Sequence, residues 1–271
     1  FPLTAYSMYG SVPLRTIKKA LLDLKAAGRL DKVRMIALTN VTFDGHMYDT
    51  RRVMEECLAI KPDLVFMWDE AWFGFGRFNW MYRRRTAMGA RREIAEWFAD
   101  PRSLDAYLEQ EKTLGADLDP ADPRLLYMRL VPDPRVARIR VYQTNSTHKS
   151  MSSLRQGSMV LVGDQDFHHH EAPFHEAVFT HASTSPNLQI IASLDVARRQ
   201  MELEGYELVT HAIALAIEIR RDVNAHPLVS KYFRVLEPAE MIPQEFRPSG
   251  LVSYTESGVT WAQALEAFRQ D

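Results

Sequence analysis

Residues 143–150 read Gln-Thr-Asn-Ser-Thr-His-Lys-Ser, and this stretch decides how the rest of the chain is interpreted. It follows the β-branched run at 137–142, so we expect it just past the end of a strand. Lys149 stands there among hydroxyl groups and an imidazole. These groups suit a cofactor that is both aldehyde and phosphate, because the amine condenses with the aldehyde while hydroxyls, imidazole and backbone N–H groups hold the phosphate. The stretch alone also fits a polar loop with a solvated lysine.

A second stretch ends a predicted strand with an acidic turn. Residues 64–68 are apolar and read as a buried strand, and Asp-Glu-Ala-Trp follows at 69–72. An acid at the carboxyl end of such a strand lies where open α/β sheets bind ligands. Asp69 would pair there with the pyridinium nitrogen of a cofactor and keep it protonated, which preserves the ring as an electron sink.

Together, Asp-Glu-Ala-Trp and Ser-Thr-His-Lys resemble the pyridoxal-phosphate-dependent ornithine/lysine/arginine decarboxylase family, of the aspartate-aminotransferase-like fold (fold type I). Residues 42–45, 183–186 and 242–250 match further, so the resemblance runs in order along most of the chain. It implies an α/β fold, with a mostly parallel sheet flanked by helices as part of the large domain of that fold.

The resemblance also implies the roles of the site residues. Lys149 would carry pyridoxal 5'-phosphate as a Schiff base, and Asp69 would stabilise the ring. Thr42 would shape the pocket from a neighbouring strand-end loop, and Trp72 would either border the cofactor or pack in the core. The other cofactor contacts implied within one chain are those of Ala71, Ser146 and His148.

Three hydroxyl residues, Ser183, Thr184 and Ser185, precede Pro186 and a predicted helix. The resemblance implies that they reach the phosphate bound by a partner chain. This predicts a homodimer, or a higher assembly of dimers, with shared active sites. The alternative is a local role, in which Ser183 or Ser185 caps the helix by accepting from its backbone N–H groups.

Predicted strands and helices alternate along the chain, which indicates a parallel sheet with right-handed crossovers and one ligand-binding edge. We assign residues 1–223 to the large domain, with an insertion near 88–136, and 224–271 to the start of a carboxyl-terminal region. Inserted loops often line pockets, so the insertion leaves the substrate open. The expected strands cover 33–38, 64–68, 137–142 and 159–162, and the main helices 12–28, 48–60, 171–181, 187–223 (with a break at Gly205) and 260–269.

Two charged runs have less specific interpretations. The basic residues of 77–92 fit a solvated or subunit-facing helix better than a nucleic-acid patch, since acidic residues balance them elsewhere. The histidines at 168–170 and 175 suggest a metal site, but three consecutive side chains cannot converge on one ion from one regular element. We therefore expect a polar helix entrance and no metal.

Composition excludes other classes of function. The 271 residues are 46% hydrophobic and 25% charged, with a net charge of −2, so no general attraction to nucleic acid or membrane is expected. Cys57 is the single cysteine, and no apolar run is long enough to span a bilayer, which favours the reducing cytoplasm. The chain begins with Phe1, and together with the larger size of family members this predicts a fragment.

Three functions fit these features. The first is decarboxylation of a basic amino acid, ornithine, lysine or arginine, to its amine and carbon dioxide. The second is another fold-type-I reaction, such as that of an aminotransferase, for which Lys149 and Asp69 serve equally well. The third is a non-catalytic role in assembly, against which the presence of both residues argues.

Overall fold

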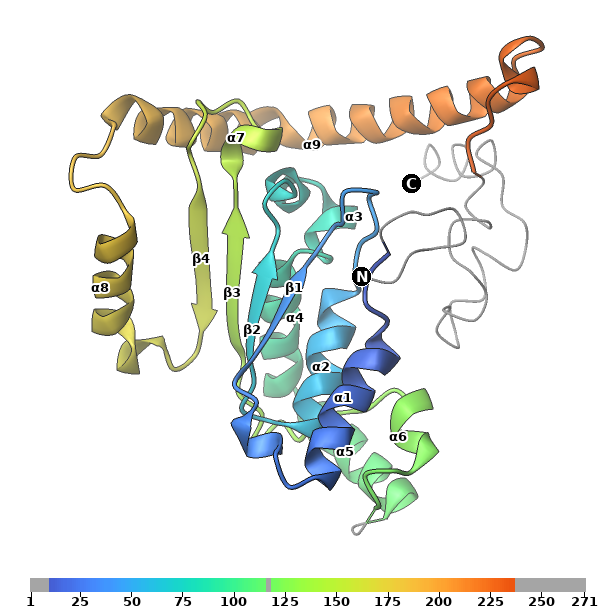
Figure 1. Ribbon diagram of the computed structural model, residues 1–271, viewed down its shortest axis with the longest axis vertical. Coiled ribbons are helices and arrows are strands. Elements are labelled where there is room, and N and C mark those ends of the chain that lie inside the picture. The colour runs from blue at the N-terminus through green and yellow to red at the C-terminus, as the bar shows by residue number, and fades with distance from the viewer. Residues whose placement is uncertain (1–9, 116–117, 237–271) are drawn as a thin grey trace.

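The computed structural model describes residues 10–115 and 118–236. Its strands form one mixed sheet in the order β1-β2-β3-β4, which confirms the expected α/β fold with a mostly parallel sheet (Figure 1). β1, β2 and β3 run parallel, and β4 pairs antiparallel with β3. Their bounds are Met35–Thr39, Val65–Asp69, Arg140–Asn145 and Met159–Asp164.

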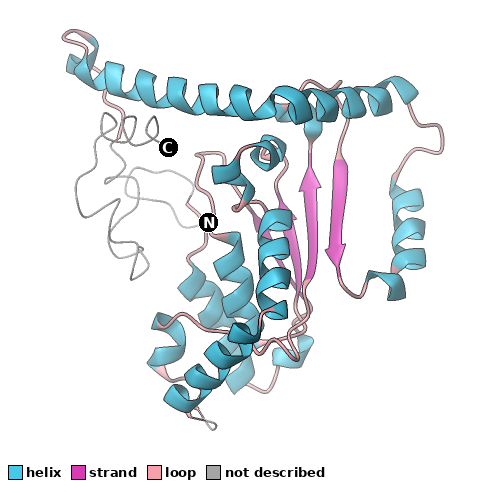
Figure 2. Cartoon of the chain, turned by 180° about the vertical axis from the view of Figure 1, so that it is seen from behind, coloured by secondary structure: helices cyan, strands magenta, loops and turns pink. Residues whose placement is uncertain are grey.

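Helices cover one face of this sheet, as Figure 2 shows from behind. Side chains alternate across a strand, so Phe66, Trp68 and Val141 point to the helices and are fully buried. They form the core with apolar residues of the helix layer. That layer consists of α1 (Leu14–Ala26), α2 (Thr50–Ile60) and α4 (Ala87–Ala99), with α5 (Pro101–Leu114) and α6 (Pro123–Tyr127) outside it.

The other face of the sheet is turned to the viewer in Figure 1, and no described helix lies in front of it. Met35 and Val160 are each 50% exposed on the strands at the two sides of the sheet. The long helix α9 (Leu188–Ala225) crosses beyond the carboxyl ends of the parallel strands instead. The remaining elements are η1 (Leu30–Lys32), η2 (Gly74–Phe78), α3 (Trp80–Arg83), α7 (Thr147–Ser150), η3 (Phe167–His169), α8 (Glu171–His181) and η4 (Val229–Lys231).

A buried charge cluster joins the insertion to the helix layer. Lys18 of α1 donates to Glu56 of α2 (2.5 Å) and to the carbonyl of Met128 (2.8 Å), which follows α6. Arg52 donates to the other oxygen of Glu56 (2.6 Å). Burial lowers the pKa of Lys18, and the hydrogen bond to Glu56 opposes that shift. Because both glutamate oxygens and the ammonium have partners, the cluster fixes where the insertion returns to the sheet.

Two expected elements were wrong in detail. Residues 77–92 do not form one helix, because the side chain of Thr86 accepts from the N–H of Gly89 (3.1 Å) and starts α4 afresh. Gly205 does not break the long helix; α9 passes through it, and a Cβ there would lie 2.9 Å from the Cβ of Phe78. Glycine thus permits close packing rather than a turn.

The third strand was also misplaced. It was expected at 137–142, whereas β3 begins at Arg140 and ends at Asn145. The match at 242–250 and the expected helix at 260–269 lie outside the described residues. Within the described ranges, no helix combines the length and apolarity needed to cross a membrane.

Candidate active site

The carboxyl ends of the three parallel strands lie level at one edge of the sheet. The register pairs Thr39 with Asp69, and Asp69 with Thr144. Backbone bonds continue past the strands, from the N–H of Asn40 to Asp69 O (2.9 Å) and from the N–H of Glu70 to Thr144 O (3.0 Å). The segments at 39–42, 69–72 and 144–149 therefore meet, as the strand order predicts.

The carboxylate of Asp69 is exposed at this edge and held in one orientation. Its Oδ1 accepts from the backbone N–H of Ala71 (3.0 Å) and from the hydroxyl of Thr144 (3.3 Å). Among residues 10–115 and 118–236, no donor uses its Oδ2. The carboxylate can therefore accept a further hydrogen bond from a protonated ring nitrogen.

Lys149 lies on the short helix α7, directly after β3. The backbone N–H of Ser146 donates to the carbonyl of Ala71 (2.7 Å), which fastens the turn after β3 to the turn after β2. The side chain of Lys149 is exposed, and its amine has no hydrogen bond or ion pair with any described residue. An amine open to a ligand and an oriented carboxylate are thus brought to the same edge.

One ring nitrogen of His148 already makes a hydrogen bond within the chain. Its Nδ1 donates to the carbonyl of Gly157 (2.8 Å). The remaining Nε2 can donate to an anion only when the ring is a doubly protonated imidazolium. Beside it, the hydroxyls of Thr147 and Ser150 are buried without a hydrogen-bond partner in the described part of the chain.

The loop after β1 fixes Trp72 but does not present Thr42. The hydroxyl of Thr42 is buried and accepts from the N–H of His46 (3.2 Å), so it serves its own turn. Val41 has a φ of 68°, an unusual conformation for a β-branched residue, and its carbonyl accepts from the indole of Trp72 (3.1 Å). Trp72 is half-buried at the edge, which is compatible with either predicted role.

Glu70 was missed as a site residue from the sequence. Its side chain is 0% exposed, and its Oε1 accepts from Asn40 Nδ2 and from the N–H of Ala87, the first residue of α4, both at 2.7 Å. Burial, and to a smaller degree the charge of Asp69, raises its pKa to about 7 against the effect of those bonds. The alternation of side chains along a strand could have predicted its burial, because the residue after Asp69 must face the helix layer.

The hydroxyls at 183–185 lie elsewhere. They are exposed in the connection between α8 and α9, on the far side of β4 from β1 (Figure 1). Ser183 accepts from the N–H of Ser185 (3.1 Å), whereas the helix is capped by Asn187, which accepts from Gln189 and Ile190. The predicted N-cap role of Ser183 or Ser185 was therefore wrong.

The histidine run forms η3 and leads into α8, the polar helix entrance that we expected. The rings of His168 and His169 contact each other with centroids 3.8 Å apart and planes tilted by 43°. No group of three metal-ligating side chains occurs in the parts of the chain described.

Comparison with known proteins identifies the family of the chain. The family described as Orn/Lys/Arg decarboxylase, major domain, matches residues 4–100 and 126–262. The chain is 30% identical over 220 residues to lysine decarboxylase LdcA of Pseudomonas aeruginosa, and 26% identical over 221 residues to the biodegradative arginine decarboxylase of Escherichia coli. These alignments cover 78% and 81% of this chain but 23% of each relative, so the chain spans about a quarter of the curated relatives it matches.

Solved structures lead to the same fold. The structure of lysine decarboxylase A from Pseudomonas aeruginosa matches with a TM-score of 0.52 at 28% identity, over 81% of this chain and 25% of that one. The constitutive lysine decarboxylase of Escherichia coli has a TM-score of 0.53 at 21% identity, over 84% and 26%, and supports the fold alone. Since the family match covers most of its residues, the chain belongs to the Orn/Lys/Arg decarboxylase family, in the region of the major domain.

Proposed function

We propose that the intact protein is a pyridoxal-phosphate-dependent decarboxylase that converts a basic amino acid, ornithine, lysine or arginine, to its amine and carbon dioxide. The observation that carries this proposal is the meeting of Lys149 and Asp69 at one sheet edge, in a chain of this family. The relatives are named for lysine, arginine and ornithine, which supports the substrate class.

The residues at the edge fit pyridoxal phosphate. Asp69 has an unused oxygen for the ring nitrogen, and Thr144 and Ala71 prevent the carboxylate from turning away. Lys149 would hold the aldehyde of the cofactor through its exposed amine. When bound, the cofactor supplies that aldehyde and a ring that accepts the electrons of a breaking bond.

For the phosphate, we propose Ser146 and His148 within the chain and the hydroxyls at 183–185 from a partner. His148 would contact the phosphate through Nε2, because its Nδ1 is held by the carbonyl of Gly157. The separation of 183–185 from Asp69 within one chain supports a homodimer with shared sites (Figure 1). We keep the division into a large domain at 1–223 and a following region at 224–271, and a cytoplasmic location, as parts of this proposal.

Labelling tests the cofactor attachment. Borohydride treatment of the intact protein with pyridoxal phosphate should fix the cofactor on Lys149, as peptide mapping would show. Lys112 and Lys231, which lie away from the sheet edge, serve as internal controls. A label on either of them, with Lys149 unmodified, would contradict the assignment. Product analysis with each of the three amino acids then identifies the amine released.

A further inference from the structure

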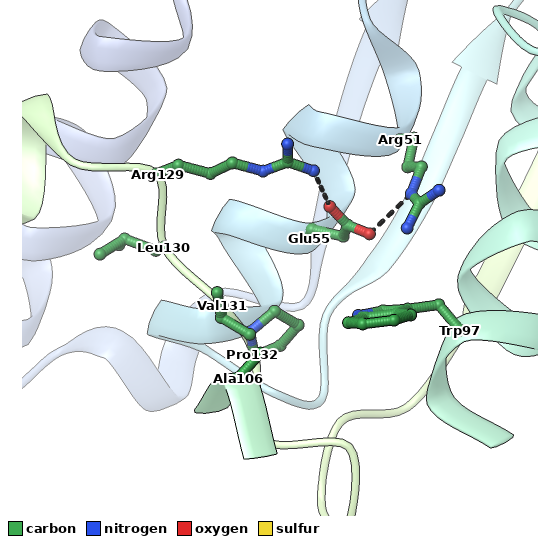
Figure 3. Close-up of a pocket in the computed structure, with 8 residues that line it drawn as sticks. All are labelled: Arg51, Glu55, Trp97, Ala106, Arg129, Leu130, Val131 and Pro132. Atoms are coloured by element: carbon green, nitrogen blue, oxygen red, sulfur yellow. Dashed lines mark hydrogen bonds and ion pairs between the residues drawn. The ribbon is translucent and has the colours of Figure 1, made fainter. Parts of the chain in front are cut away.

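A cavity lies on the outer side of the helix layer, away from the sheet. It measures about 240 Å³ and is formed by α2, α4, α5 and the segment after α6 (Figure 3). Pockets for drug-sized ligands begin at about 300 Å³, so this one suits a smaller molecule. The candidate active site lies at the carboxyl ends of the strands and shares none of these lining residues.

The walls of this cavity are held in place. Gln110 of α5 donates to the carbonyl of Arg129 (2.7 Å) and accepts from the N–H of Val131 (2.8 Å), so one side chain fixes the backbone of the return segment. Leu130 between them is 3% exposed. α5 falls outside the family match, whereas the return segment at 129–132 falls inside it, so only the α5 side of the wall is an addition to the shared domain.

Charged groups alternate along one side. Glu55 accepts from Arg51 Nε (2.7 Å) and from Arg129 Nη2 (2.9 Å), as Figure 3 shows. Arg51 also donates to Glu93 (3.3 Å), which Arg84 contacts at 2.7 Å. Three arginines thus face two carboxylates, and both oxygens of Glu55 already have donors. These five side chains together therefore carry a net positive charge.

Arg129 is the residue that presents this positive charge to the cavity. Its side chain is 60% exposed, and within the described ranges no acceptor uses its N–H groups other than the one bound to Glu55. The opposite side is apolar: the indole of Trp97 lies across from Val131 and Pro132 in Figure 3. A guanidinium with free N–H groups beside an apolar wall matches a small molecule with an apolar ring and one carboxylate.

We propose that this cavity binds a small aromatic monocarboxylate, with its carboxylate on Arg129 and its ring between Trp97 and Pro132. A cation of the same shape is disfavoured, because the carboxylate of Glu55 is neutralised by the two guanidiniums on either side of it. The site is independent of the proposed decarboxylase reaction and of any cofactor.

Ligand-observed NMR on the intact protein tests this with benzoate and with benzylamine, which share a ring and differ in charge. Benzoate should bind and benzylamine should not. Arg129→Gln should weaken benzoate binding by about tenfold or more, since it removes a charge-assisted hydrogen bond. Ala106→Phe, which fills the cavity without changing its charge, should abolish binding. Arg135→Gln removes an arginine from the same segment that pairs with Asp133, and should change nothing.

A further variant, Lys149→Ala, separates the two sites. Benzoate binding that survives Lys149→Ala and is lost in Ala106→Phe supports the outer cavity. The proposal is overturned if benzoate does not bind at millimolar concentration, if benzylamine binds equally well, or if Ala106→Phe binds benzoate like the wild type. Loss of binding in Lys149→Ala alone would place the benzoate at the sheet edge and would also overturn it.

Discussion

At the scale of residues, Asp69 at the end of β2 and Glu70 directly after it have opposite surroundings. Asp69 points to the exposed edge, while Glu70 points into the helix layer and holds the first turn of α4 and the loop after β1. One oxygen of Glu70 is buried without a partner in the described part of the chain. Such a carboxyl group is better accommodated neutral than charged.

Glu70→Gln should therefore change how stability depends on pH. A pKa raised to about 7 means that the folded protein binds this proton more tightly than the unfolded chain. The contribution to stability is full below the unfolded pKa of about 4.5 and is lost as the pH rises through 7. The glutamine variant lacks this loss, so at pH 8 it should be more stable than the wild type by about 3 kcal/mol.

Urea unfolding of the intact protein between pH 5 and 8 would measure this difference. The advantage of Glu70→Gln should shrink toward pH 5. Equal differences at all pH values would mean that Glu70 does not titrate in this range.

Asp69→Asn isolates the charge at the edge. Asparagine keeps an oxygen for Ala71 and Thr144 but removes the negative charge beside the ring nitrogen. Decarboxylase activity should fall by roughly a thousandfold, because several kcal/mol of charge stabilisation are lost. Asp63→Asn, before the opposite end of β2, is the matched control. Near-normal turnover of Asp69→Asn in steady-state assays would disprove the role of the charge.

At the scale of elements, α9 braces from outside the sheet edge that carries the candidate site. η2 approaches this helix so closely at Gly205 that an added Cβ would meet Phe78 at 2.9 Å and Met201 at 3.0 Å. A second contact joins the same elements, since Asn79 donates to Thr210 (3.1 Å). The helix therefore keeps the turn after β2, which contains Ala71 and Trp72, from moving away from the sheet.

Gly205→Ala should destabilise the intact protein although alanine is the better helix former. Overpacking costs about 1–3 kcal/mol, against a gain of about 1 kcal/mol in helix propensity. In a Phe78→Gly background, which removes the Cβ that the added methyl group would meet, the same change should cost less. Urea midpoints of the four proteins give the coupling, and a stabilising Gly205→Ala in the wild-type background would show that the contact is loose.

The sequence predicted the strands and their shared edge well, because apolar runs and the acid or lysine that follows them are local patterns. It did not predict the direction of β4, since alternation is the same in either direction. Nor did it reveal that Gly205 is needed for packing, because the atom it accommodates belongs to Phe78, far away in the chain. The roles of Thr144 and Glu70 depend on the register between strands.

At the scale of the whole molecule, the segment at 183–185 lies in the connection between α8 and α9, on the far side of β4 from β1 (Figure 1), and mixing chains tests the proposed shared sites. Mixing Lys149→Ala chains with chains that carry Ser183→Ala, Thr184→Ala and Ser185→Ala should restore activity. In a hybrid dimer with shared sites, one site receives both defects and the other receives none. Each variant alone should be inactive.

The control for this mixing is Thr180→Ala, because the hydroxyl of Thr180 donates to the carbonyl of Glu176 within α8; these chains should stay active alone. Native mass spectrometry should confirm the hybrids. Absence of recovery in confirmed hybrids would mean that each chain builds its own site.

The crossover from β2 to β3 carries α5 and α6 on the outer side of the helix layer. The entropy of closing a flexible loop grows only slowly with its length, by about 0.6 kcal/mol for each doubling. The longer route therefore takes little from the stability of the sheet. Its effect is on the rate of folding instead. We expect β2 and β3 to pair late, because their contacts join residues 75 positions apart in sequence. In a refolding protein, Asp69 and Thr144 should be among the last neighbours to meet.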